Sequence, residues 1–422
     1  MSKKYDVAIL GGGVVGLTLA LLLARDRLRI ALVTPARPTA PASPDIRAYA
    51  LNLAARQLLE SLRVWPESTD GSGPSPVTPV TRMWVSDATA NAALTFDASE
   101  AGTDTLNWIV DVPALEDRLA QAVRYQGGIE WLPERPAAAL TVICEGKRSA
   151  SREAFGFHHD SKPYPHTAIA ARLQCERPHG TVARQWFRGD EILALLPMGG
   201  ASGHEVALVW SVPHERAHEL LAMPPAALAQ RVEQACDQAL GAMTLQGQPA
   251  GWPLELSRAD HWVKPGVALA GDAAHAMHPL AGQGLNVGLG DAAELAKVLH
   301  EREYWRELGD LKLLRRYERA RQADFAQMAL MTDGLFGLFS APDSRIQALR
   351  GWGLRGFDRL QPIKRWAMNC TIWRSMSTSG PLSASSAMPA SAIVASVIVF
   401  STSRIKVGIR TSTLSRTTMT TP

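Results

Sequence analysis

GDAAHAMHPLAGQGLNVGLGD, residues 271–291, is the segment from which the fold of this chain is best inferred. It follows an apolar run at 267–270, typical of a buried strand, and leads into residues 285–299, where apolar side chains recur at helical spacing. Four glycines, Gly282, Gly284, Gly288 and Gly290, lie where this helix should begin, although glycine disfavours helices. We therefore predict that a ligand approaches the backbone here, and that free N–H groups at residues 284–286 stabilise its negative charge. A plain turn capped by an aspartate is the alternative.

A second glycine-rich segment lies near the start of the chain. Residues 5–10, YDVAIL, have the pattern of a buried strand, residues 11–16, GGGVVG, contain G-x-G-x-x-G, and residues 17–25 continue as an apolar helix. Gly11 makes the turn, Gly13 lets a pyrophosphate touch the backbone, and Gly16 lets the helix pack closely on the strand. Placed between a strand and a helix, the motif predicts a dinucleotide-binding unit.

Further candidate contacts follow the next strands. Residues 29–33 should end at an acidic ligand for a ribose hydroxyl, but the chain has Thr34, whose hydroxyl is a weaker partner. Arg47 could bind a phosphate or lie near a ring system, or it could simply pair with Asp45 at the surface. Glu145 and Gly146 follow the strand-like run 140–144, where a glycine turn with nearby Ser and Arg suits phosphate contact and equally suits a basic turn.

Composition excludes several classes of protein. A chain of 422 residues should form two domains, or one large fold with an inserted domain. The net charge is +4, but residues after Asp358 carry eight Lys/Arg and no Asp/Glu, so the preceding part has 36 basic against 40 acidic residues. The basic balance belongs to the tail, and nucleic-acid binding is not favoured.

The cysteines and the apolar runs indicate a cytoplasmic protein. The four cysteines, Cys144, Cys175, Cys236 and Cys370, are far apart and have no His-rich companion, which favours reduced thiols and no metal site. We expect no signal peptide, because the first residues run directly into a strand. No apolar run reaches the roughly 18 residues that span a bilayer.

Strand-like runs at 166–173, 181–187, 192–197 and 205–212 separate the two glycine-rich motifs. They suggest an inserted β-rich domain that faces the ligand. Trp186, Trp210 and Trp252 could line an apolar pocket there, although aromatic residues at strand spacing are more often core. Residues 71–80 are expected to form a loop, residues 335–349 a last helix, and the Ser/Thr-rich residues after 375 a disordered tail.

These motifs occur in an order and spacing that resembles the FAD-dependent aromatic hydroxylases of the para-hydroxybenzoate hydroxylase type. The similarity is greatest to the hydroxylases of ubiquinone biosynthesis. It extends to DIRAYALN at 45–52, LNWIVDVPALEDRL at 106–119, LALLPM at 193–198 and RYERARQADFAQMALMTDGLFGLF at 316–339, and covers about residues 4–368.

The resemblance implies an α/β fold, in which a Rossmann-like FAD-binding domain carries an inserted β-sheet substrate domain and is followed by C-terminal helices. The FAD-binding domain would comprise residues 1–80, 113–160 and 256–368, the last with the C-terminal helices. The substrate domain would comprise residues 81–112 and 161–255. Residues 369–422, whose low-complexity composition differs from the family's C-terminus, are expected to form the disordered tail.

The resemblance also assigns roles to individual residues. Gly11, Gly13 and Gly16 would hold the FAD pyrophosphate, Thr34 takes the place of the acidic ribose ligand, and Asp272, after Gly271, would bind the ribityl chain. The isoalloxazine would be flanked by Pro279, Gly282, Gly284, Leu285 and Asn286. Arg47 would lie near FAD, and Glu145 with Gly146 would match an Asp-Gly motif that touches FAD and the nicotinamide cofactor. No catalytic side chain is required, and His278 and Pro279 are the candidates beside the flavin.

The activity implied is hydroxylation of a polyprenyl phenol in ubiquinone biosynthesis, with NAD(P)H and O2, through a C4a-hydroperoxide of the flavin. A polyprenyl substrate implies peripheral contact with the inner membrane, and a biosynthetic complex is a further expected partner. Two alternatives remain open: a flavin hydroxylase of a soluble aromatic compound, and a catalytically weak scaffold subunit. Thr34, Glu145 and an apparently shortened segment before Leu140 motivate the second.

Overall fold

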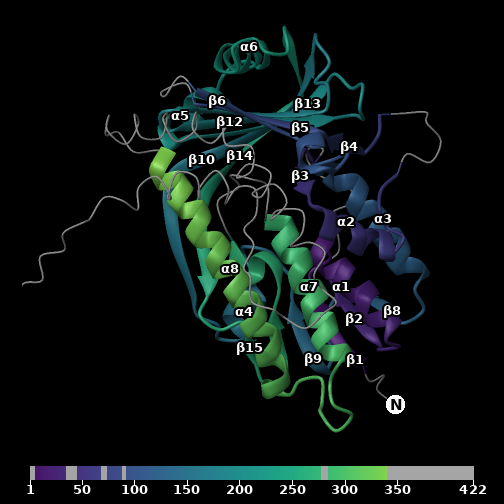
Figure 1. The fold of residues 1–422 in the computed structure, drawn as a ribbon. Coiled ribbons are helices and arrows are strands. Elements are labelled where there is room, and N and C mark those ends of the chain that lie inside the picture. The colour runs from purple at the N-terminus through teal and green to yellow at the C-terminus, as the bar shows by residue number, and fades with distance from the viewer. Residues whose placement is uncertain (1–4, 35–44, 68–73, 88–91, 277–283, 340–422) are drawn as a thin grey trace, which may run out of the picture.

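The structure is a computed structural model that describes residues 5–34, 45–67, 74–87, 92–276 and 284–339 (Figure 1). Its first layer is a six-stranded sheet in the order β15-β16-β9-β1-β2-β8. The strands are β1 (Tyr5–Leu10), β2 (Ile30–Val33), β8 (Ile129–Leu132), β9 (Ala138–Ile143), β15 (Val263–Lys264) and β16 (Val267–Leu269). Neighbours from β16 to β8 are parallel, and only β15 is antiparallel. The inner strands are buried on both faces, which explains their continuous apolar runs.

Helices cover this sheet and complete the main hydrophobic core. They are α1 (Val14–Arg25), α3 (Val112–Tyr125), α7 (Gly284–His300) and α8 (Leu311–Phe339), and α7 packs between α1 and α8 (Figure 1). The apolar face of each helix joins the strands in one cluster, with Leu17, Leu119 and Leu295 fully buried. No helix in the described part of the chain is both long and apolar enough to cross a bilayer.

The second layer is an eight-stranded, mainly antiparallel sheet in the order β17-β14-β10-β13-β12-β11-β5-β6. Its strands are β5 (Arg82–Asp87), β6 (Ala92–Asp97), β10 (His159–Cys175), β11 (Val182–Arg188), β12 (Glu191–Met198), β13 (Glu205–Pro213), β14 (Met243–Ala259) and β17 (His275–Ala276). Helices α5 (His214–Leu221) and α6 (Pro225–Ala235) pack on its outer face, against Ile169, Leu208 and Trp210 (Figure 1). Because side chains alternate along a strand, the neighbours of these residues on β10 and β13 face the first layer.

A three-stranded antiparallel sheet joins the two layers. It consists of β3 (Ala48–Leu51), β7 (Asn107–Asp111) and β4 (Val77–Val80), in the order β3-β7-β4. The short helices are α2 (Leu53–Ser61), capped by Asn52, and α4 (Ala150–Ala154), capped by Ser149, and 3-10 turns lie at Ser99–Ala101 and Gly271–Ala273. This third sheet contacts β12 of the eight-stranded sheet through β4 and β7, and α7 of the first layer through β3.

Most of the expected elements are confirmed, and the mixed α/β fold is as expected. One expectation is wrong: residues 77–80, assigned to a loop, form β4, because Val80 is buried and pairs with Asn107. Strands β10 and β14 run across the domain boundaries expected at 160/161 and 255/256, so the division into domains stays a prediction. The tail and most of the helix expected at 335–349 lie outside the described residues.

Candidate functional site

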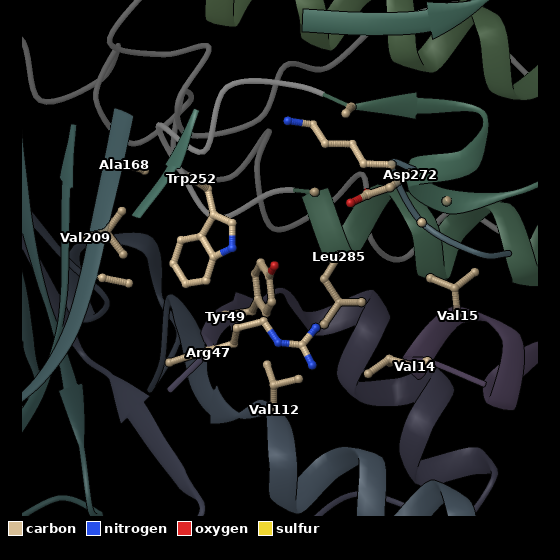
Figure 2. A pocket seen from close by; sticks show the side chains of 18 of the residues that line it. Val14, Val15, Arg47, Tyr49, Val112, Ala168, Val209, Trp252, Asp272 and Leu285 are labelled. Atoms are coloured by element: carbon tan, nitrogen blue, oxygen red, sulfur yellow. The ribbon is translucent and has the colours of Figure 1, made fainter. Parts of the chain in front are cut away.

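A cavity of about 400 Å³ lies between the parallel sheet and the inner face of the eight-stranded sheet (Figure 2). One wall is formed by the start of α1, the turn after β16 and the start of α7. The opposite wall is formed by β10, β13 and β14, and β3 closes one side. Its lining includes Gly13, Val14, Val15, Arg47, Tyr49, Val112, Glu116, Gly146, Lys147, Ala168, Ala170, Ala207, Val209, Trp252, Gly271, Asp272, Gly284 and Leu285. Segments more than 200 residues apart in sequence therefore meet at one site.

Two of the three glycines of the first motif meet the steric requirements that the sequence predicts, and the third is open. Gly11 has φ of +117°, and a Cβ added there would collide with the backbone of Cys144. A Cβ on Gly16 would collide with the carbonyl of Gly11, so this glycine lets α1 approach the turn. Gly13 differs, because a Cβ there would meet no protein atom within 4 Å. Gly13 lines the cavity, and its contact with a pyrophosphate stays a prediction.

Two helices begin at this cavity, and both starts suit an anionic ligand. No side chain caps α1 in the described structure, and its first turn contains no acidic residue. The first turn of α7 is also free of acidic residues, and Gly284 faces open space. Gly146, on the third segment, has φ of +83° and is similarly open. The free N–H groups and the helix dipoles would stabilise negative charge between these segments.

A buried ionic network around Asp291 stabilises the turn at residues 271–276. The Asp291 carboxylate, which has no exposed surface, accepts hydrogen bonds from the Gly271 N–H at 2.9 Å and from Arg321 Nε at 2.8 Å. It also lies 2.6 Å from Nε2 of His275, whose ring is 2% exposed and packs between Trp262 and Phe325. Burial alone would raise the pKa of Asp291, but the charges of His275 and Arg321 keep it below the usual value.

Asp272 and Arg47 both reach the cavity, as predicted. The Asp272 side chain opens into it, and the surrounding protein raises the pKa of this carboxyl, an effect that His275 and Lys147 oppose. Arg47 donates to both oxygens of Asp45, at 2.6 Å for the closest contact, and to Glu116 at 3.1 Å. Arg47 therefore forms the pair with Asp45 and also lines the cavity, whereas its contact with a phosphate or a ring system stays a prediction. The hydrogen bond to Asp45 raises the pKa of Arg47.

The segment after β9 places its glycine, rather than its carboxylate, at the cavity. Glu145 accepts hydrogen bonds from the hydroxyls of Ser149 at 2.6 Å and Ser151 at 2.7 Å. Arg152, which is buried, donates to the carbonyls of Lys147 and Ala273 and so ties this segment to the 271–276 turn. A cofactor contact by Glu145 itself stays a prediction, whereas Gly146 lines the cavity.

The α7 motif combines residues that face the cavity with residues that hold the protein together. Leu285 lines the cavity, but the Asn286 side chain accepts from the N–H of Asn52 and donates to the carbonyl of Ala50 at 2.7 Å. Asn286 thus anchors the β3–α2 connection to α7. The expectation that all the glycines admit a ligand is wrong for Gly288 and Gly290, because the atoms that approach them belong to Val15 and Arg321.

Other predicted residues lie away from the cavity or outside the described chain. Thr34, at the end of β2, packs against Gly12, where its methyl group would collide with any Cβ. His278, Pro279 and Gly282 lie outside the described residues. In the described part of the chain, no group of three or more His, Cys, Asp or Glu side chains could hold a metal ion.

Two aromatic side chains lie at the cavity: Trp252, one of the three tryptophans considered for a pocket, and Tyr49, which sequence reasoning missed. Trp186 and Trp210 are core residues as expected, but Trp252 is 44% exposed and projects into the cavity from β14. Tyr49 projects into it from β3 (Figure 2). The available signal for Trp252 was its setting in GWPL, where glycine and proline interrupt a strand, and this signal is weak.

Comparison with known proteins is consistent with this geometry. The family model described as an FAD binding domain matches residues 76–332. The chain is 30% identical to the ubiquinone hydroxylase UbiL of Rhodospirillum rubrum, covering 87% of this chain and 89% of that protein. It is also 30% identical to the 3-demethoxyubiquinol 3-hydroxylase of Escherichia coli, covering 88% and 99%. The crystal structure of p-nitrophenol 4-monooxygenase PnpA from Pseudomonas putida has the same fold, with a TM-score of 0.68 at 17% identity, covering 87% and 97%.

Proposed function

Because the chain belongs to the FAD-dependent monooxygenases and carries their FAD binding domain, we propose that it hydroxylates the ring of a polyprenyl phenol in ubiquinone biosynthesis. NAD(P)H and O2 would be the co-substrates. The observation that carries the proposal is the cavity itself, where two helix starts without acidic residues in their first turns face an apolar sheet surface. This chain covers 89% and 99% of two relatives that are named as a ubiquinone hydroxylase and a 3-demethoxyubiquinol 3-hydroxylase. Their names support the substrate class.

The residues at the cavity fit FAD. The start of α1, opened by Gly13, would bind the pyrophosphate, and Asp272 would accept hydrogen bonds from the ribityl hydroxyls. Gly11, Gly16, Gly271 and Asn286 would act by shaping these segments, and Thr34 would approach the adenosine ribose. Gly146, Gly284 and Leu285 would lie near the isoalloxazine, with Arg47 and Glu145 close by. Pro279, His278 and Gly282 stay predicted neighbours of the ring.

The protein then has two tasks beside binding. FAD, when bound and reduced, supplies the activation of O2. The start of α7 would stabilise negative charge on the ring system, since its N–H groups are fixed before reaction. The apolar walls, formed largely by Val14, Val112, Ala168 and Val209, would keep water from the reacting atoms.

The first experiment is the visible absorption spectrum of the purified protein, followed by NAD(P)H consumption and product analysis with 2-geranylphenol. We expect a flavin spectrum that NAD(P)H bleaches, and a product heavier by one oxygen atom. A protein that takes up no FAD when it is supplied in excess would refute the enzyme. A protein that hydroxylates only unprenylated phenols would refute the substrate class.

A polyprenyl substrate also leads us to propose a cytoplasmic protein that contacts the inner membrane at its surface, within a biosynthetic complex. The apolar cavity wall supports the membrane contact, because a prenyl tail must leave the bilayer to reach the cavity. Flotation of the full chain with liposomes measures this contact. Recovery wholly in the soluble fraction at low salt would argue against it.

A further inference from the structure

Trp252 has an unusual position for a large apolar side chain. It lies on the inner face of the eight-stranded sheet, directly opposite Ala168 of β10, and remains 44% exposed. Its neighbour Gly251 faces the other way, because a Cβ there would lie 2.7 Å from Leu221 of α5. Alternation along β14 therefore directs Trp252 into the cavity (Figure 2). Exposing so much apolar surface inside a cavity is unfavourable unless a ligand covers it.

The surface around Trp252 is built from small residues. Ala168 and Ala170 lie on β10, and Ala207 and Val209 lie on β13, all at the cavity. Larger side chains, such as Leu208 and Trp210, alternate with them and belong to the core on the other face. The small residues leave a flat apolar floor beside the indole. A planar ring fits such a floor edge to face or stacked against Trp252.

Tyr49 supplies a polar group at the same place. Its side chain projects into the cavity from β3, and its hydroxyl has no hydrogen-bond partner among the described residues (Figure 2). Burial, and next the charge of Asp272, raise the pKa of this phenol, so it stays protonated at neutral pH. A protonated hydroxyl can donate to an oxygen on a ligand and also accept from it.

We propose that Trp252 and Tyr49 form the recognition site for the substrate ring, with the indole packed on the ring and the Tyr49 hydroxyl hydrogen-bonded to its phenol oxygen. This inference rests on the proposed function and assigns residues to it. Both residues are positioning groups, because they orient the ring and take no part in the oxygen transfer. The residues proposed above to hold FAD are different ones.

The test uses Tyr49→Phe and Trp252→Leu in the FAD-loaded enzyme, with Tyr304→Phe and Trp305→Leu as matched controls. The control residues are 94% and 66% exposed, lie between α7 and α8 and do not line the cavity. Flavin content is measured first. Binding of 2-geranylphenol and of its methyl ether then follows from tryptophan fluorescence, and turnover gives KM, kcat and product formed per NAD(P)H consumed.

We expect full flavin content in all four variants. Tyr49→Phe should bind the phenol about fivefold to tenfold more weakly and no longer prefer it over the methyl ether, as loss of one hydrogen bond predicts. Trp252→Leu should raise KM about tenfold, abolish most of the fluorescence change, and lower the product formed per NAD(P)H. The controls should match the wild type.

Each other outcome has a definite meaning. If the wild type is active and the Tyr49 and Trp252 variants bind the phenol as it does, the inference is overturned and the proposed function stands. If either variant loses flavin, the residue contacts the cofactor, and the inference is again overturned. If the FAD-loaded wild type hydroxylates no phenol, the proposed function fails, and the inference fails with it.

Discussion

The buried Asp291 network should be the strongest single determinant of the turn at residues 271–276, and Asp291→Asn tests this. The carboxylate accepts from Gly271, His275 and Arg321 through two oxygens, whereas an asparagine offers one oxygen and an NH2 group. If the NH2 group faces Arg321, it meets a buried cation. If it faces Gly271, it leaves a buried N–H unpaired. Either arrangement leaves one partner unsatisfied.

Breaking a buried ion pair costs about 3–5 kcal/mol. Arg321 keeps two other partners, the Asp324 carboxylate at 2.7 Å and the Val287 carbonyl at 3.0 Å, so we expect a loss near the lower limit, about 3 kcal/mol. At roughly 2 °C per kcal/mol for a chain of this size, the melting temperature should fall by about 6 °C. Asp324→Asn is the matched control, because this side chain pairs with the same guanidinium but is 53% exposed, and it should cost less than about 1 kcal/mol.

The effect should also depend on pH. The pKa of Asp291 is lower in the folded protein than in the unfolded chain, where aspartate titrates near about 3.9. Its contribution is therefore complete above about pH 5 and is lost as the pH falls through the folded pKa. Thermal unfolding of wild type and Asp291→Asn across this range should show a difference that narrows below about pH 4. Equal losses in Asp291→Asn and Asp324→Asn, or a difference independent of pH, would refute the argument.

Three further predictions concern neighbouring features. Gly13→Ala should leave the melting temperature of the apoprotein unchanged and reduce the flavin content of the purified protein. Gly16→Ala should lower the melting temperature of the apoprotein, because only the Cβ at residue 16 collides with protein atoms. Similar melting temperatures of the two apoprotein variants would refute this. Arg172→Met should lower the free energy of unfolding, measured by chemical denaturation, by about 3 kcal/mol. The substitution leaves the Asp111 carboxylate and the carbonyls of Ile46 and Arg47 without the buried guanidinium that donates to them. A loss below about 1 kcal/mol would contradict this. Burial raises the pKa of Cys175 to about 12 and of Cys236 to about 11, so a disulfide reagent at pH 8 should label neither thiol until the protein unfolds.

The sequence predicts best where one local requirement selects one residue type. Gly11 and Gly16 could be interpreted from their spacing, because a turn and a close helix contact each exclude a side chain. Gly288 could not be assigned correctly, because the group that excludes its side chain is Val15, which lies more than 270 residues earlier in the chain. The sequence also could not decide whether Trp252 lines a pocket or belongs to the core. Only the pairing of β14 with β10 decides which face of the sheet it occupies.

Most polar side chains of the motifs bind other groups of the protein. Asn286 binds the backbone of Ala50 and Asn52, Asp291 binds the N–H of Gly271, and Glu145 binds Ser149 and Ser151. What the motifs present at the cavity is the Asp272 side chain and backbone opened by glycine, at Gly13, Gly146 and Gly284. This division changes the meaning of Glu145, where the resemblance leads one to expect aspartate. A residue whose task is to hold a loop can be longer by one methylene group, provided that it still reaches its partners, and both serine hydroxyls lie within 2.7 Å. The substitution therefore gives no reason to infer a weak or inactive relative, and the flavin content of the wild type should be that of a working enzyme.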